Sequence, residues 1–362
     1  MAINRDSVPS FRLPSGATSI AVASDFLAYL EAKACSPNTV RAYAFDLRHF
    51  DRFLQRASLR WDRLTTGQAV ELMLFLRSTP SKHKDRRSAQ ARLSPASVNR
   101  ILAAIASFYE WAQLAGHFHS RSPFERVQVR SSFTAIDQHR PFLHGIARRS
   151  PTRRPLRVRM ARRLPRPLTE EQLQRLFGAL QSRRDVAIMR LMLDGGLRPG
   201  EVLGLQLKDI AYGRKRITIR WREDHPRGVR AKSRTERVVD LHEAATLEAV
   251  NRYVLEERPE KSTSPYLFLV GGRGSRGLLP LSYAAVARAF SRACTRAGIR
   301  APGVTPHALR HTHATRMWEG GMRELTLQRR LGHASPESTR IYTRVSDETV
   351  LAEYQRALGR AR

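Results

Sequence analysis

Five short stretches in the second half of the chain carry side chains suited to chemistry at a phosphodiester. They lie at residues 196–201, 231–237, 305–311, 331–333 and 335–342. The candidate catalytic residues in them are Arg198, Lys232, His307, Arg310, His333 and Tyr342. A guanidinium group can hold two phosphate oxygens at once and keeps its proton, so a pair of arginines suits the charge that develops on a phosphate under attack. A tyrosine hydroxyl is a candidate nucleophile for that attack.

The spacing of one stretch places three of these side chains together. Thr305 is predicted to cap a helix that Pro306 opens, since proline costs nothing at the first helical position. His307, Arg310 and His311 then stand at positions i, i+3 and i+4, on one face of that helix.

The remaining candidates suit the roles of nucleophile, general base, general acid and hydrogen-bond donor in a reaction at phosphorus. The pKa of a free tyrosine is near ~10, so Tyr342 needs nearby cations to ionise, and His307 is the candidate to take its proton. Lys232 is the candidate to protonate the oxygen that leaves phosphorus. His307 and His333 are further hydrogen-bond donors to the phosphate.

Two neighbours of the arginines are assigned supporting roles. Glu201 lies three residues after Arg198, a spacing that suits a carboxylate that orients a guanidinium better than a general base. His311 follows Arg310 directly. A phosphate bound covalently to the tyrosine would keep the energy of the broken bond, so a second hydroxyl could attack it without ATP.

Local signals predict the elements that must position these residues. Residues 169–172 have the Thr-x-x-Gln pattern of a capping box and open a helix that continues to Leu180. A second helix over 185–193 ends at two glycines. Two strands are predicted at 217–221 and 238–241, and helices return after Leu281. The expected domain is mostly helical with a small antiparallel sheet.

The first third of the chain predicts a separate helical domain. Ser36 and Ser94 are each followed by proline, which is the pattern of an N-cap and a first helical residue. Apolar residues after both recur with the period of a helix. With further helices near 24–32 and at 66–76, these signals predict a domain over residues 20–116 that follows an N-terminal tail at 1–19.

A basic segment separates the two domains. Residues 138–169 contain ten arginines, five prolines and no acidic residue. The segment could be a solvated disordered linker, but the absence of acids favours a strap laid along phosphates. The linker is placed at 117–166 and the second domain at 167–362. The candidate DNA-binding residues in the linker are Arg148, Arg149, Arg153 and Arg154.

Composition narrows the partners. The chain has 64 Lys and Arg against 32 Asp and Glu, a formal net charge of +32, which favours double-stranded DNA as partner. A membrane partner is not expected, because no run of apolar residues is long enough to span a bilayer. The start of the chain lacks the apolar core of a signal peptide, so a cytoplasmic location is expected. Cys35 and Cys294 are far apart in sequence, so a disulfide framework and a zinc ribbon are not expected.

The order of the candidate residues resembles the tyrosine recombinase (lambda-integrase-like) family. The signature of that family is Arg, a hairpin Lys, His-x-x-Arg, His or Trp, and Tyr. Its most specific matches here are the frame at residues 306–311 and the spacing from Gly332 to Tyr342. The resemblance covers roughly residues 165–360, and the N-terminal helical domain is similar to the core-binding, SAM-like domain of the family.

This resemblance carries several expectations. It implies a catalytic domain of the DNA breaking-rejoining fold that cleaves and rejoins DNA through a 3′-phosphotyrosine, with no metal and no cofactor. It implies a homotetramer on two DNA sites and a nucleoid-associated protein, with accessory proteins an open question. The long basic segment looks like those of transposon-borne integrases. A predicted C-terminal helix over 348–358 could dock on a neighbouring subunit or on its own domain.

Other interpretations stay open. His307 and His311 have the spacing of zinc ligands, but the glutamate of an HExxH motif is absent and Arg310 between them would repel a cation. A non-catalytic DNA-binding protein would explain the charge but not the order of the candidates. A type IB topoisomerase would use similar chemistry. Arg234 lies two residues from Lys232, so the hairpin lysine depends on the alignment.

Overall fold

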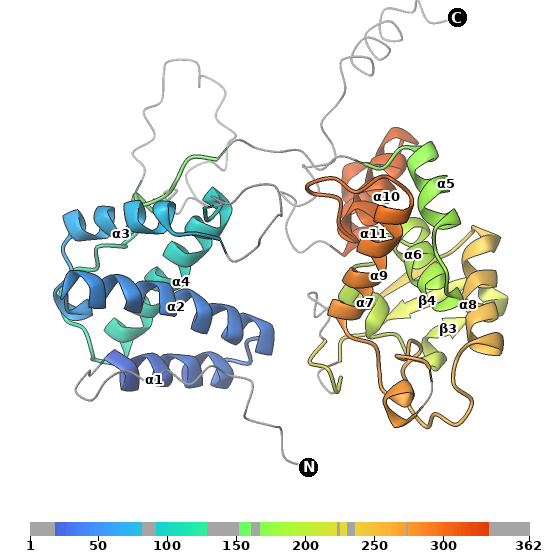
Figure 1. The fold of residues 1–362 in the computed structure, drawn as a ribbon, viewed down its shortest axis with the longest axis horizontal. Helices are drawn as coiled ribbons and strands as arrows, with labels where there is room; N and C mark the ends of the chain where they lie inside the picture. Colours follow the sequence, from blue (N-terminus) through green and yellow to red (C-terminus); the bar gives the residue numbers. More distant parts are fainter. Residues whose placement is uncertain are drawn as a thin grey trace, which may run out of the picture. The chain divides into compact units, whose positions relative to one another are not determined.

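In a computed structural model of the protein, the described residues are 19–81, 92–128, 152–160, 167–222, 225–229, 236–272 and 274–332. The chain divides into two units, residues 1–162 and 163–362 (Figure 1). No helix among the described residues is long and apolar enough to cross a lipid bilayer.

The first unit is built from four long helices. They are α1 (Ser19–Ala32), α2 (Pro37–Ala57), α3 (Thr66–Ser78) and α4 (Pro95–Leu114), with a short 3-10 helix η2 (Trp61–Arg63) before α3. Ser36 and Ser94 cap α2 and α4 as predicted, because each hydroxyl accepts a backbone N–H of the first turn, 3.1 Å from Thr39 and 3.2 Å from Ser97. Both helices continue with proline at the first helical position.

Aromatic side chains form much of the core of this unit. Phe26 of α1 contacts Phe108 and Trp111 of α4, with ring centroids 5.6 and 5.5 Å apart. Phe118 and Phe124, which follow α4, are buried in the same core. The core therefore extends beyond the position at which the sequence predicted the helical domain to end.

Part of the predicted linker also packs on this unit. Strands β1 (Val127–Gln128) and β2 (Thr152–Arg153) pair antiparallel. Beyond β2, the side-chain amide of Asn99 on α4 holds the backbone of Val158, with hydrogen bonds of 3.0 and 2.8 Å. Only residues 161–166 lie between the last described residue of this unit and the first of the next. The described parts of the predicted linker, residues 117–128 and 152–160, therefore belong to the first unit.

The second unit is mainly helical. Its helices are α5 (Glu170–Gly178), α6 (Arg183–Asp194), α7 (Pro199–Leu203), α8 (Ala244–Glu256), α9 (Tyr283–Arg296), α10 (His307–Glu319) and α11 (Glu324–Leu331). Short 3-10 helices are η3 (Leu207–Asp209), η4 (Tyr212–Arg214) and η5 (Ser275–Leu278), and the strands are β3 (Ile210–Ala211), β4 (Arg216–Ile219) and β5 (Arg237–Asp240). The predicted capping box at the start of α5 is present, since Thr169 and Gln172 exchange hydrogen bonds.

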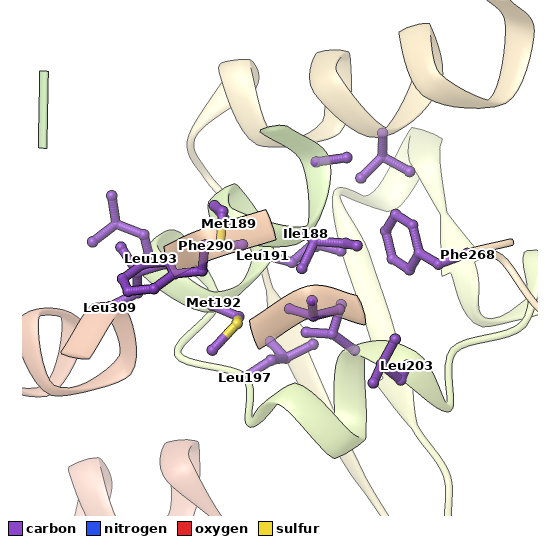
Figure 2. Packing of buried hydrophobic residues seen from close by; sticks show 14 of the residues in the cluster. Ile188, Met189, Leu191, Met192, Leu193, Leu197, Leu203, Phe268, Phe290 and Leu309 are labelled. Carbon is purple, nitrogen blue, oxygen red and sulfur yellow. The ribbon is translucent and has the colours of Figure 1, made fainter. Parts of the chain in front are cut away.

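Helix α6 runs through the middle of this unit and packs against α7, α8, α9 and α10. Its apolar side chains are buried on several sides, and Figure 2 shows Ile188, Met189 and Met192 among residues from the surrounding elements. Phe290 comes from α9 and Leu309 from α10. The helix ends at two glycines, and this buried end places the following turn at the site.

The sheet is small and antiparallel, in the order β3-β4-β5. Ile217 is opposite Val239, and both face the core. The first predicted strand is shorter than expected, because β4 ends at Ile219 and Trp221 lies beyond it. The sequence prediction also missed α8, which begins without a side-chain cap at Glu243 and so lacks the usual start signal.

The start of α10 differs by one residue from the prediction. Helix α10 begins at His307, and Pro306 occupies the cap position instead of the first helical position. The backbone N–H of Ala308 still bonds to the carbonyl of Thr305, at 2.8 Å, so the turn closes one residue earlier than the helix. The mainly α fold with a small antiparallel sheet is confirmed.

Candidate active site

The turn between α6 and α7 brings Arg198 to the site. Gly196 has φ of +63°, a conformation that favours glycine, and a Cβ there would come within 2.5 Å of the His313 ring. Arg198 caps α7, and its backbone N–H donates to Oε2 of Glu201 at 2.8 Å. Its side chain returns to the same carboxylate, from Nη1 to Oε1, also at 2.8 Å. The local i, i+3 spacing therefore fixes both the backbone and the side chain of Arg198.

Glu201 holds a second arginine from the sheet and lies close to a third from α10. Arg237, the first residue of β5, forms a fork on the carboxylate with hydrogen bonds of 2.9 Å to Oε1 and 2.8 Å to Oε2. Nη1 of Arg310 lies 3.7 Å from Oε2. The Glu201 side chain is fully buried, and the exposed fractions of Arg198, Arg237 and Arg310 are 16%, 10% and 3%.

This carboxylate is ionised in spite of its burial. Burial raises the pKa of Glu201, but the hydrogen bonds and charge of Arg237, with the charges of Arg310 and Arg198, outweigh it and lower the pKa to about 2. A buried carboxylate with these partners is a fixed anion, which orients guanidinium groups and cannot serve as a base near neutral pH.

Arg310 is held by backbone carbonyls. Its Nη1 donates to the carbonyl of Gly196 at 2.5 Å, and its Nη2 donates to the carbonyl of Leu331 at 2.7 Å. Nη2 of Arg198 donates to the next carbonyl, that of Gly332, at 3.0 Å. Arg198 and Arg310, which lie more than 100 residues apart in sequence, thus meet at Glu201 and at the C-terminal end of α11.

The two histidines of α10 differ in exposure. His307 is exposed and lies one turn before Arg310, while His311 is half-buried. Burial, together with the charges of His307 and Arg310, lowers the pKa of His311 to about 4, so its ring is neutral near pH 7. A neutral His311 can stand beside Arg310 without charge repulsion.

Several candidates fall outside the described residues. These are Lys232, His333, Tyr342, Arg148 and Arg149, together with Arg234 and the predicted helix 348–358. Arg153 lies in β2. Arg154 donates from Nη1 to the carbonyl of Ala103 at 3.1 Å and from Nη2 to Glu110 at 3.1 Å, so its guanidinium is bound to α4.

Sequence reasoning missed three residues of this site. Arg237 stood within the basic hairpin stretch but was not singled out, and Arg330 and His313 were not considered. His313 is buried and accepts a hydrogen bond from Arg330 at 3.1 Å. None of these interactions joins residues at helical spacing, so no local pattern could have indicated them. In the described part of the chain, no group of three His, Cys, Asp or Glu gathers to hold a metal ion.

Comparison with known proteins agrees with this geometry. Residues 166–349 match the phage integrase family, and residues 23–116 match the phage integrase N-terminal SAM-like domain. The chain therefore belongs to the phage integrase family, that of the tyrosine site-specific recombinases.

Curated relatives extend over most of the chain. Transposase A from transposon Tn554 of Staphylococcus aureus is 29% identical over 337 residues, which is 92% of this chain and 90% of the relative. Tyrosine recombinase XerC of Corynebacterium glutamicum is 30% identical over 274 residues, 74% of each chain. Tyrosine recombinase XerD of Mycobacterium tuberculosis is 29% identical over 346 residues, 91% of this chain and 94% of the relative.

Solved structures share the fold. The Tn1549 transposon integrase in complex with a circular intermediate DNA has a TM-score of 0.61 at 17% identity, and the match covers 93% of this chain and 99% of that one. A lambda integrase dimer bound to a core site has a TM-score of 0.57 at 17% identity, with coverage of 90% and 94%. These structures confirm the predicted fold, and the family match over residues 166–349 confirms the predicted family.

Proposed function

We propose that this recombinase cleaves and rejoins DNA at specific sites with Tyr342 as nucleophile and with Arg198 and Arg310 as the binding site for the scissile phosphate. The observation that carries this proposal is the meeting of both arginines at Glu201 and at the end of α11, directly before His333. Lys232 and His307 are the proposed acid and base.

The charge of the site suits the reaction. Three guanidinium groups against one carboxylate leave two net positive charges in a largely buried setting. A phosphodiester carries one negative charge, and attack by a phenolate brings a second onto the pentavalent phosphorus. Fixed cations in a water-poor site stabilise this added charge with little reorganisation.

The proposed steps conserve atoms and charge. The Tyr342 oxygen attacks phosphorus after its proton passes to His307, and the bond from phosphorus to the 5′-oxygen breaks. Lys232 gives a proton to that oxygen, so a 5′-hydroxyl and a 3′-phosphotyrosine remain. Attack by a different 5′-hydroxyl reverses these steps and releases Tyr342. No step needs a metal ion, a cofactor or ATP.

Exchange between two duplexes requires four cleaved strands, so four copies of the chain on two DNA sites are the proposed assembly. The likeness to Tn554 transposase A supports the ends of a mobile element as the DNA substrate. The formal net charge of +32 supports a location on cytoplasmic, nucleoid DNA.

Covalent capture followed by strand exchange tests this function. DNA that remains bound to the protein under denaturing conditions is sequenced, and two differently labelled duplexes with that site are then mixed with the protein. Recombinant duplexes are expected. Relaxation of supercoiled DNA without exchange would indicate a topoisomerase instead, and binding without covalent attachment would indicate a non-catalytic DNA-binding protein.

A further inference from the structure

Three consecutive carbonyls at the end of α11 are each bound by a different arginine. Nε of Arg237 donates to the carbonyl of Arg330 at 3.0 Å, ahead of the bonds that Arg310 and Arg198 make to Leu331 and Gly332. The last carbonyls of a helix lack partners within the helix and carry its partial negative charge, so cations stabilise them. All three arginines also contact or approach Glu201.

Arg237 is the one member of this group to which the proposed mechanism assigns no contact with the phosphate, only a share in the charge of the site. Its two terminal nitrogens are directed at the carboxylate of Glu201 and its Nε at the end of α11. It therefore links the anion that orients Arg198 to the backbone that leads into His333. A lysine could carry the same charge but has no planar fork for these three bonds.

Gly332 gives an independent sign of how closely Arg237 fits. The φ of Gly332 is +63°, and a Cβ at this position would lie 2.7 Å from Nη1 and 3.0 Å from Cζ of Arg237. The guanidinium therefore packs directly against the backbone of the residue that precedes His333. A side chain there would displace either the guanidinium or the chain.

We propose that Arg237 is a positioning residue, which fixes the end of α11 against Glu201 and so sets the place of His333 relative to Arg198 and Arg310. This inference rests on the proposed function. Arg237 is not a ligand of the phosphate. Its removal moves the catalytic groups and leaves DNA binding nearly intact.

Arg237→Lys tests this role because it keeps the charge beside Glu201 and removes the fork. DNA affinity should stay within a few-fold of wild type, while cleavage of bound DNA slows by about 10²-fold, the cost of a displacement of about 1 Å in an active site. In a His333→Ala background, Arg237→Lys should slow cleavage much less, because both changes affect the same group. The proposal would be overturned if Arg237→Lys slowed cleavage by the same factor with and without His333→Ala. It would also be overturned if Arg237→Lys affected DNA binding alone.

A second measurement does not depend on activity. Backbone hydrogen exchange over residues 328–336 should be faster in Arg237→Lys and in Gly332→Ala than in wild type. Gly298→Ala is the matched control, since Gly298 has φ of +67° but no atom within 4 Å of its Cβ position. It should leave exchange at the end of α11 unchanged. Unchanged exchange in Arg237→Lys would refute the positioning role. If wild type forms no covalent complex, the proposed function fails, and the exchange data still decide the role of Arg237.

Discussion

Nε of Arg330 donates a hydrogen bond to Nε2 of His313 at 3.1 Å, so this nitrogen of His313 must stay unprotonated. Burial, with the charge of Arg330, lowers the pKa of His313 to about 3 even though a hydrogen bond to the backbone of Leu193 opposes the shift. The two side chains join α10 to α11, and the ring also fills the space beside Gly196. A neutral histidine is therefore part of the support beneath the site.

The first prediction concerns acid sensitivity. Because the folded-state pKa of His313 lies below the usual 6.5, its contribution to stability is complete above pH 6.5 and is lost as the pH falls toward 3. Between pH 6.5 and 5 the decrease should be about 2 kcal/mol, at about 1.4 kcal/mol for each pH unit. Unfolding of wild type and His313→Gln at pH 7 and pH 5 should show the gap between them shrinking in acid. The control is His242→Gln at an exposed site, and a constant gap for His313→Gln would contradict the prediction.

The opposite sign is expected in the first unit. Burial raises the pKa of Asp46 to about 6 although Arg100 opposes the shift from 2.8 Å away. The folded protein then keeps a proton that the unfolded chain has released, so stability falls as the pH rises from about 4 to 6. Asp46→Asn should raise the unfolding temperature at pH 8, by the equivalent of about 1–3 kcal/mol, and much less at pH 4.5.

Asp62→Asn is the matched comparison for Asp46. A hydrogen bond from Arg60 lowers the pKa of Asp62, so this replacement should lower stability at pH 8 instead of raising it. Thermal unfolding of both variants decides the signs. A stabilising effect of Asp46→Asn that did not depend on pH would show that the cost lies in packing and not in the buried charge.

Lys232 has a chemical test. If it protonates the leaving 5′-oxygen, Lys232→Ala should slow cleavage by about 10²–10⁴-fold. A sulfur in place of the bridging 5′-oxygen departs without a proton, so the variant should then cleave nearly as fast as wild type. Arg198→Ala should not be rescued, because the proposed task of Arg198 is to stabilise the non-bridging oxygens. Rescue of Arg234→Ala in place of Lys232→Ala would shift the acid by two residues, and rescue of neither would place it outside the hairpin.

The basic segment is predicted to bind phosphates and not bases. Replacing Arg148 and Arg149 with Gln should weaken binding equally on target and random DNA, and the slope of log K against log salt should fall by about 0.9 for each phosphate that the protein no longer neutralises. Arg154 also has a structural role, because its guanidinium is bound to α4. Arg154→Gln should lower the stability of the first unit. Weakening on target DNA alone, with a constant slope, would mean that the segment reads sequence or shape.

Local signals predicted much of the fold. The starts of three helices were predicted from their capping residues, Ser36, Ser94 and Thr169, because a capping side chain and the first turn lie within four residues. Helix α8 lacks such a cap and was missed. The packing of residues 152–158 on α4 was also missed, since the bonds between Asn99 and Val158 span 59 residues.

In the candidate site, too, the contacts between residues near in sequence could be predicted, and those between distant residues could not. The link from Arg198 to Glu201 follows from a spacing of three residues within one turn. Arg237 bonds to the side chain of Glu201, 36 residues before it, and to the carbonyl of Arg330, 93 residues after it. Only the folded sheet and α11 bring these residues together. Motif order proposes which side chains do chemistry, and that assignment stays a prediction, whereas the residues that hold Arg198 and Arg310 follow from tertiary packing.

The most direct test of the central claim is the covalent bond to Tyr342. On a nicked DNA substrate that traps the cleaved state, wild type should give a protein–DNA band on a denaturing gel, and peptide mapping should place the DNA on Tyr342. Tyr342→Phe should bind the same DNA with near-normal affinity and give no covalent band. A covalent band that persists in Tyr342→Phe, or a bond mapped to another residue, would contradict the account.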